Sequence, residues 1–200
     1  MDYAASEPEV TEATPALALK ILIAGGFGVG KTTMVGTISE IRPLHTEELL
    51  SEQGIGVDDT SGVESKTTTT VALDFGRITI TEDLQLYLFG TPGQDRFWFL
   101  WDELSQGALG AVVLADTRRL QECFPAVDFF EQREIPFVVA VNCFDGARRH
   151  DPAKIRRALG LNGTAPIVLC DVRDRESVKE VLTTLVTYAV EGAFKDPHPV

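Results

Sequence analysis

The amino-acid sequence predicts an α/β fold: a mostly parallel, six-stranded sheet with helices on both faces. From residue 17 onward, short apolar runs rich in Val, Ile and Leu alternate with amphipathic stretches, which is typical of βα units. Several of these runs are apolar nearly throughout, as in strands that are buried on both faces. The expected strands are 17–24, 71–75, 84–89, 108–116, 137–142 and 167–170, and the expected helices are 31–41, 97–106, 121–133, 152–159 and 176–191.

Three intervals fall outside this alternation. Residues 43–66 are polar and precede the second expected strand, and so long a loop in a compact domain is usually functional. Residues 1–16 are acidic and aperiodic, so we expect a flexible N-terminal tail, one domain over 17–192 and a C-terminal tail over 193–200. With 200 residues, of which 44% are hydrophobic, the chain can bury the core of one ordinary domain.

The net charge, the cysteines and the lengths of the apolar runs indicate which ligands and which cellular compartment to expect. A net charge of −12 opposes nucleic acid and anionic lipid as main ligands. Cys123, Cys143 and Cys170 have no short spacing, which indicates reduced thiols rather than disulfides or a zinc site. No apolar run reaches the length of a membrane span. We expect a cytoplasmic protein that binds no nucleic acid and does not insert directly into a membrane, any membrane recruitment being through partners.

The strongest motif is Gly-Gly-Phe-Gly-Val-Gly-Lys-Thr at residues 25–32, a phosphate loop (GxxxxGK[ST]) between an expected strand and an expected helix. Its glycines allow a tight loop whose N–H groups converge on the β-phosphate. The Lys31 ammonium would reach the β- and γ-phosphate oxygens, and the Thr32 hydroxyl would bind magnesium. The expected nucleotide-binding residues here are Gly25, Gly28, Val29, Gly30, Lys31, Thr32 and Thr33.

Three further motifs accompany expected strands. Residues 67–75 read TTTTVALDF, residues 90–95 read GTPGQD and residues 142–145 read NCFD. Together with the phosphate loop, they resemble the small Ras-like GTPases over nearly all of residues 18–190. This resemblance implies the G domain of a phosphate-loop (P-loop) NTPase: an enzyme that binds GTP or GDP with Mg²⁺ and acts as a molecular switch.

By this resemblance, Thr70 would complete the magnesium shell and sense the γ-phosphate, with Thr69 as the alternative register. The β-propensity of threonine offers a plainer explanation of the run. Gly93 would offer its N–H to the γ-phosphate, and Gln94 would orient the attacking water. The implied catalytic residues are Gln94, Lys31 and Thr70, and the implied magnesium ligands are Thr32 and Thr70.

The chain departs from the Ras-like pattern around the γ-phosphate. Gly90 stands where the family carries the aspartate that supports magnesium through a water. Asp74 and Asp116 are the alternative carboxylates, and the sequence does not rank them. Phe27 occupies the place of a glycine, and no arginine stands in cis beside Thr70. We therefore expect slow intrinsic hydrolysis that a partner assists in trans.

Asn142 and Asp145 match the guanine-specifying N-x-x-D element, although Cys143 replaces its lysine. Asp145 would accept hydrogen bonds from guanine N1–H and from the N2 amino group, which adenine does not offer. Asn and Asp are also common turn formers at strand ends. Val172 follows the last expected strand and, by the resemblance, would contact guanine through its backbone N–H.

The sequence GTPGQ at residues 90–94, without the aspartate, resembles that of the MglA-like bacterial GTPases. The whole set of motifs, including residues 113–120 and 141–146, resembles the conservon GTPases of actinobacteria. Resemblance to that group implies a roadblock/LC7-type regulatory protein and a sensor-kinase-like membrane protein as partners in bacterial signalling. Two alternatives stay open. One is a nucleotide-bound pseudo-GTPase adaptor without hydrolysis, and the other is a P-loop ATPase or kinase.

An aromatic run follows Gln94. Phe97, Leu100 and Trp101 would share one face of a helix, whereas residues 98 and 99 would point elsewhere. Core packing is one interpretation of the run. A partner surface that is exposed in one nucleotide state is the other.

Overall fold

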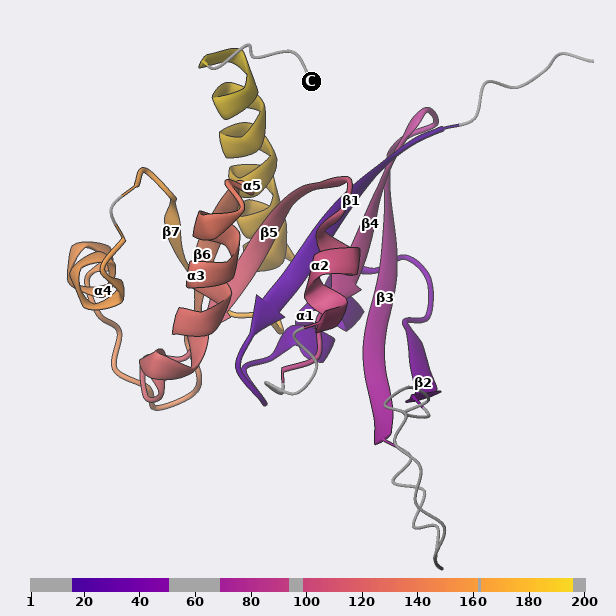
Figure 1. Ribbon diagram of the computed structural model, residues 1–200. Helices are drawn as coiled ribbons and strands as arrows, with labels where there is room; N and C mark the ends of the chain where they lie inside the picture. The colour runs from indigo at the N-terminus through magenta and orange to yellow at the C-terminus, as the bar shows by residue number, and fades with distance from the viewer. Residues whose placement is uncertain (1–15, 51–68, 94–98, 162, 196–200) are drawn as a thin grey trace, which may run out of the picture.

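The computed structural model describes residues 16–50, 69–93, 99–161 and 163–195, which form one sheet with helices against both faces (Figure 1). The strands are β1 (Leu17–Gly25), β2 (Leu44–Leu50), β3 (Thr69–Thr81), β4 (Leu84–Gly90), β5 (Ala108–Ala115), β6 (Phe137–Asn142) and β7 (Ile167–Cys170). The helices are α1 (Lys31–Ile38), α2 (Phe99–Ser105), the 3-10 helix η2 (Leu120–Cys123), α3 (Phe124–Gln132), α4 (Pro152–Leu159) and α5 (Arg175–Lys195). Within the described residues, none of the helices has an apolar stretch that could cross a membrane.

The strands follow the order β2-β3-β4-β1-β5-β6-β7 across the sheet. Strands β4, β1, β5, β6 and β7 are parallel to one another, whereas β2–β3 and β3–β4 are antiparallel pairs. The predicted α/β class with a mostly parallel sheet is therefore confirmed. Because five strands run in one direction, the loops that follow them meet at one edge of the sheet, where α/β proteins bind ligands.

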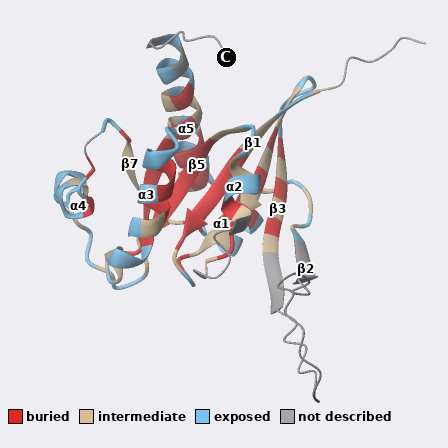
Figure 2. Ribbon diagram, in the orientation of Figure 1, coloured by how far each residue is buried: buried red, intermediate tan, exposed pale blue. Residues whose placement is uncertain are grey.

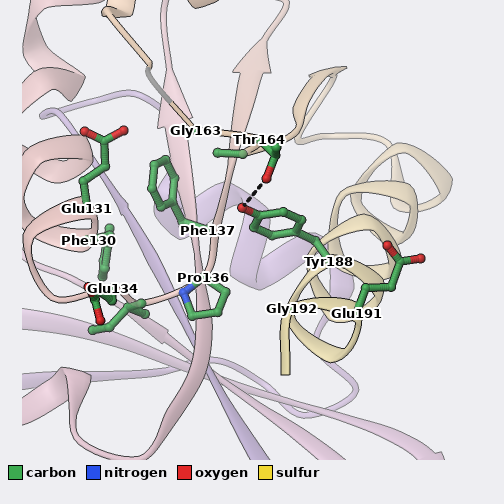
Figure 3. A pocket seen from close by; sticks show the side chains of 12 residues that line it. Phe130, Glu131, Glu134, Pro136, Phe137, Gly163, Thr164, Tyr188, Glu191 and Gly192 are labelled. Carbon is green, nitrogen blue, oxygen red and sulfur yellow. Dashed lines mark hydrogen bonds between the residues drawn. The ribbon is translucent and has the colours of Figure 1, made fainter. Parts of the chain in front are cut away.

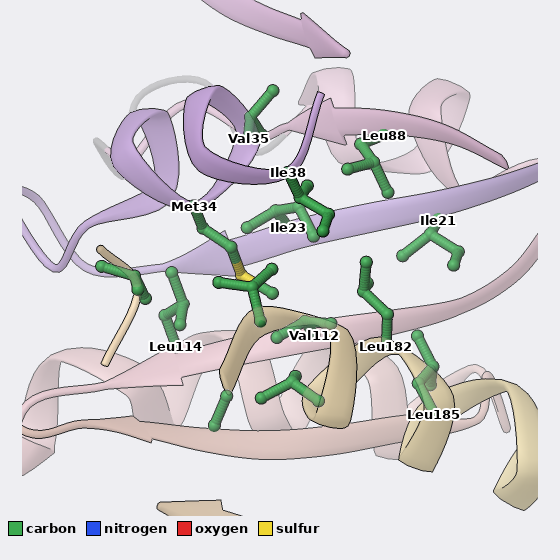
Figure 4. Close-up of a cluster of buried hydrophobic side chains, with 14 of the residues drawn as sticks. Ile21, Ile23, Met34, Val35, Ile38, Leu88, Val112, Leu114, Leu182 and Leu185 are labelled. Carbon is green, nitrogen blue, oxygen red and sulfur yellow. The ribbon is translucent and has the colours of Figure 1, made fainter. Parts of the chain in front are cut away.

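Alternate residues of β1 belong to two separate cores. Ile21 and Ile23 pack with α1 and α5 on one face of the sheet (Figure 4). Leu22 and Ala24 pack with α2, α3 and α4 on the other face. Figure 2 shows the result as continuous buried segments along β1 and β5. Burial on both faces is the physical reason that these strands are apolar nearly throughout.

The structure adds one strand to the predicted elements and shifts the bounds of several others. The sheet contains a seventh strand, β2, inside the interval 43–66 that the sequence predicts to be a loop. Its sequence, LHTEELL, lacks the apolar run of a buried strand, because among the described strands it lies at the edge of the sheet and pairs with β3 alone. Strand β3 extends well beyond residues 71–75. Helix α5 runs to Lys195, so the expected domain boundary at residue 192 falls inside a helix.

Part of the aromatic run lies in the core. Trp101 is only 3% exposed, and its ring centroid lies 5.2 Å from that of Phe129 and 5.9 Å from that of Phe130. Core packing is therefore the correct interpretation for Trp101. Residues 97 and 98 lie outside the described residues.

Candidate functional site

Three glycines shape the loop between β1 and α1. Gly25, Gly28 and Gly30 have φ angles of 132°, 69° and 111°, which residues other than glycine rarely adopt. A Cβ atom at Gly25 would lie 2.4 Å from the Leu114 carbonyl oxygen, and one at Gly30 would lie 2.9 Å from Nδ2 of Asn142. The loop is therefore packed tightly against the ends of β5 and β6, and its N–H groups lead into the start of α1, a ready site for phosphate.

The side chain of Lys31, the first residue of α1, folds back onto this loop. Its Nζ donates to the carbonyl oxygens of Gly25 at 2.9 Å and Gly26 at 2.7 Å. Burial lowers the pKa of Lys31 to about 8, against the opposing effect of two nearby carboxylates. A Cβ atom at Gly93 would lie 2.6 Å from Nζ. The structure thus brings together the lysine and the glycine that the sequence assigns to the γ-phosphate.

Asp74 lies beside Thr32, the expected magnesium ligand. The Thr32 hydroxyl donates to Oδ2 of Asp74 at 2.6 Å. Asp74 is also directly paired with Gly90 across the β3–β4 ladder, and a Cβ atom at Gly90 would lie 2.9 Å from Cβ of Asp74. A carboxylate on the neighbouring strand therefore occupies the space next to the position where the Ras-like pattern has its aspartate. The structure ranks Asp74 above Asp116 as its replacement.

Asp116 has a different task. Its buried carboxylate accepts from Nε of Arg118 at 2.9 Å and from Nη2 at 2.7 Å, and these hydrogen bonds hold the pKa of Asp116 below its usual range. The Arg118 guanidinium in turn lies 4.2 Å from the ring centroid of Phe144. Asp116 therefore braces the loop that follows β6.

The residues around Thr32 fit a magnesium ion. Magnesium is usually held by one or two carboxylates together with substrate phosphates and waters. The Thr32–Asp74 pair supplies one hydroxyl and one carboxylate close to the phosphate loop. The Thr91 hydroxyl, one residue beyond Gly90, is buried and has no hydrogen-bond partner within the described residues, which suits a metal-bound water. Thr32 and Asp74 would hold the ion, which would neutralise phosphate charge when bound.

At the other end of the site, Asn142 links three loops. Its Nδ2 donates to the Val29 carbonyl at 3.0 Å, and its Oδ1 accepts from the Val172 N–H at 3.3 Å. Asn142 is 4% exposed. A buried amide with both ends satisfied fixes the phosphate loop relative to the loops after β6 and β7. The predicted residues Val29, Asn142 and Val172 are therefore brought together.

Asp145 is engaged by an arginine that the sequence analysis did not single out. Nη1 and Nη2 of Arg173 donate to its two carboxylate oxygens at 2.7 Å and 2.9 Å. Arg173 also donates to Asp171, and these hydrogen bonds lower the pKa of Asp171 to about 2 and hold the pKa of Asp145 below its usual range. A base that used Asp145 as an acceptor would have to displace Arg173. Arg173 directly follows Val172, which the resemblance places beside the base, so its position in the sequence could have indicated a contact with Asp145.

Several predicted residues are placed only in part. Gln94 lies outside the described residues. Thr70 lies on β3 opposite Leu49 of β2, and Thr69 is the first residue of β3, but only their backbone is described. Thr33 is an exposed residue of α1. The structure therefore leaves the roles of Gln94, Thr70 and Thr33 as predictions.

A cavity of about 370 Å³ lies apart from this site (Figure 3). It is lined by the end of α3, the start of β6 at Phe137, the segment before β7 and the last turns of α5. The hydroxyl of Thr164, before β7, lies 3.2 Å from that of Tyr188 on α5. Asn142, by contrast, ends β6. The cavity therefore lies at the opposite end of the strand from the phosphate loop and is not part of the nucleotide site.

The three cysteines give a probe of the end of the site where the sequence predicts that the base binds. Burial raises the pKa of Cys123 and of Cys170 to about 12, whereas Cys143 is partly exposed next to Asn142. We expect iodoacetamide to label Cys143 much faster than the two buried thiols. Saturating nucleotide is expected to slow the labelling of Cys143 by at least about tenfold, because only the free protein then reacts. Peptide mass spectrometry measures the rates, and unchanged Cys143 labelling in a protein shown to bind nucleotide would contradict this placement of the base.

The fold and the loop geometry define a nucleotide-binding P-loop protein. The chain belongs to the family described as conserved hypothetical ATP binding protein, whose model matches residues 23–192. An uncharacterized protein of Methanocaldococcus jannaschii is 30% identical over 129 residues, which cover 64% of this chain and 71% of that protein.

Solved structures show the same fold. The G domain of the T. maritima FeoB iron transporter has a TM-score of 0.61 and 19% identity, and the match covers 86% of this chain and 99% of that one. The cytosolic domain of the same transporter in a GDP form has a TM-score of 0.62 and 19% identity, with 88% of this chain and 65% of that chain covered. At this identity the likeness establishes the fold and not the nucleotide.

Proposed function

We propose that the protein is a magnesium-dependent GTPase that acts as a switch between GTP- and GDP-bound forms. The observation that carries the proposal is the bridge made by Asn142, which joins the phosphate loop to Val172 and sets Asp145 just beyond the end of β6. Phosphate binding and base recognition are thereby held in one rigid frame. Lys31 and Thr32 serve the phosphates at one end, and Asp145 serves the base at the other.

Guanine suits the groups at the base-binding end. The Asp145 carboxylate is an acceptor for the N1–H and N2 amino group of guanine. The Val172 N–H donates to Asn142 in this structure, so a contact with O6 of guanine, which the resemblance implies, would require this N–H to be shared or released. Adenine presents a lone pair at N1 and offers no N1–H or N2 amino group, so it gives the Asp145 carboxylate no hydrogen bond to accept. Asp145 is exposed, so it is accessible to a base once Arg173 moves.

ATP is the second candidate nucleotide, because the description of the family names ATP binding. The two nucleotides are separated by heating the purified protein, identifying the released nucleotide by chromatography, and then competing GTP against ATP with magnesium present. Released GDP or GTP with a clear guanine preference supports the proposal. Adenine nucleotide, or equal competition, would overturn the GTPase assignment in favour of an ATPase.

The Asp145→Ala variant tests the reading of the base. We expect it to weaken GTP binding by about 10- to 100-fold, since a hydrogen bond to a charged group contributes about 1.5–3 kcal/mol. ATP affinity should stay within about threefold. Isothermal titration calorimetry measures both affinities. Asp151→Ala, which removes a helix-capping carboxylate at the start of α4, is the control and should leave both nucleotide affinities unchanged.

Turnover by the isolated protein is expected to be slow. The bulky side chain of Phe27 stands at the phosphate loop, where it is 70% exposed and would obstruct the attacking water. The roadblock/LC7-type and sensor-kinase-like partners stay predictions from the resemblance, as does the role of Gln94 in orienting water. A protein that bound GTP and never hydrolysed it would instead be the nucleotide-bound adaptor.

A further inference from the structure

An arginine from the connection between β5 and α3 lies on the phosphate loop. Arg119 immediately precedes η2, and its Nη2 donates to the Phe27 carbonyl at 3.3 Å, across 92 positions of sequence. The same nitrogen would be 3.9 Å from a Cβ atom at Gly28. Phe27 and Gly28 belong to the part of the loop that faces the terminal phosphate in the proposed function. A second cation therefore stands beside the phosphate site, in addition to Lys31.

The contacts of Arg119 hold it loosely. Nη1 lies 3.2 Å from Oε1 of Glu122 and Nη2 lies 3.8 Å from Oδ2 of Asp116, and the Arg119 side chain is 42% exposed. Glu122 itself lies against the loop, because a Cβ atom at Gly26 would be 2.6 Å from its Oε2. These are single, partly solvated contacts, which contribute little individually. The guanidinium can therefore leave them when a stronger anion is present.

The neighbouring arginine is different. Arg118 makes three hydrogen bonds to the buried Asp116 through Nε and Nη2 and also lies over Phe144. Its guanidinium is committed to the structure of the loop after β6. Within the described residues, Arg119 is the arginine whose guanidinium donates to a carbonyl of the phosphate loop.

We propose that Arg119 supplies, from within the same chain, the positive charge that stabilises the γ-phosphoryl group during hydrolysis. The inference rests on the proposed function. The Phe27 carbonyl, a weak acceptor, would be exchanged for γ-phosphate oxygens, which form shorter and stronger charge-assisted hydrogen bonds with a guanidinium. The sequence alone predicts instead that a partner assists hydrolysis in trans, because no arginine stands in cis beside Thr70.

The step that Arg119 would assist is in-line hydrolysis. Water adds to the γ-phosphorus while the bond from phosphorus to the β–γ bridging oxygen breaks, and the electron pair of that bond stays on the β-phosphate. The proton of the water leaves to solvent or to the inorganic phosphate formed. Charge builds on the oxygens around the γ-phosphorus in this transition state, and an arginine there accelerates hydrolysis by about 10³- to 10⁵-fold in other phosphate-loop enzymes.

The test compares Arg119→Ala with the wild-type protein in single-turnover hydrolysis and in binding of GDP with aluminium fluoride. We expect hydrolysis and the binding of this transition-state analogue to fall by about 100-fold or more, and GDP affinity to change by less than about threefold. Arg119→Lys should recover little, because one ammonium does not reproduce the planar fork. Added guanidinium ions should partly restore hydrolysis to Arg119→Ala, which a merely structural role would not allow. Arg157→Ala, an exposed arginine on α4, is the control for loss of charge.

Two outcomes would overturn the proposal. One is hydrolysis by Arg119→Ala at the wild-type rate, and the other is a parallel loss of GDP affinity, which would make Arg119 a support of the loop. Failure of the proposed function looks different, since a wild-type protein that prefers ATP reveals itself in the competition assay before any variant is made. A wild-type protein that binds GTP without hydrolysing it, and whose affinity for the analogue does not depend on Arg119, overturns the proposal and leaves GTP binding intact.

Discussion

Replacing Lys31 by methionine is expected to weaken nucleotide binding by at least about 100-fold. The Nζ atom now donates to two loop carbonyls, and phosphate oxygens would take their place. Each hydrogen bond to a charged group contributes about 1.5–3 kcal/mol, and about 1.4 kcal/mol is a factor of ten in affinity. Methionine keeps the length of the side chain while removing its charge. Fluorescence titration with a labelled nucleotide measures the loss.

The affinity of the wild-type protein should also depend on pH in a defined direction. Burial lowers the pKa of Lys31 to about 8 in the free protein, and bound phosphate favours the ammonium form. Below pH 8 the ammonium is already present, so affinity is constant; above pH 8 a proton must be taken up on binding, so affinity falls as pH rises. Lys31→Arg keeps its charge and should remove this fall. Lys179→Met on α5, which removes a lysine that pairs with Glu176, is the control. A wild-type affinity that stayed level from pH 7 to about 9 would contradict the assignment.

The Asp74→Ala variant is expected to lose about 10- to 100-fold in affinity for nucleotide with magnesium, and much less without it. Asp74 accepts from the hydroxyl of Thr32 at 2.6 Å, and removal leaves the expected metal ligand without its partner. Titrations with magnesium and with a chelator measure the two affinities. Equal losses under both conditions would mean that Asp74 supports the fold rather than the ion.

Matched variants sharpen this test. Asp83→Ala removes a carboxylate from the turn between β3 and β4 and should not change the dependence on magnesium. Gly90→Asp alone should be destabilising, because its side chain meets that of Asp74 across the ladder. The exchange Asp74→Gly with Gly90→Asp returns the carboxylate to the strand where the Ras-like pattern has it, and should recover magnesium dependence that Asp74→Ala lacks.

Local patterns predicted much of the fold and of the phosphate loop. Six of the strands are visible as apolar runs because the sheet is buried on both faces, and the glycines at 25, 28 and 30 carry their signal within eight residues. Strand β2 was missed because an edge strand with polar residues lacks that pattern. The aromatic run was ambiguous for a related reason: its helical period was clear, but the surface that would cover Trp101 comes from α3.

Contacts between distant segments could not be predicted in the same way. Choosing Asp74 over Asp116 required the register of β3 against β4, which sets Asp74 opposite Gly90. Arg119 contacts the phosphate loop across 92 positions of sequence, and no local pattern predicts such a contact. The Arg173–Asp145 ion pair likewise joins two loops that only the order of β6 and β7 makes neighbours.

The location of Asp74 within a strand has a consequence for how such a switch would signal. Strand β3 is hydrogen-bonded on both sides, to β2 and to β4, so its carboxylate is anchored independently of the segment that follows Gly90. A magnesium ion bound there would not travel with that segment when the γ-phosphate departs. The ion would therefore stay bound to the diphosphate after hydrolysis. The protein would change conformation on hydrolysis while its affinity for GDP stayed high.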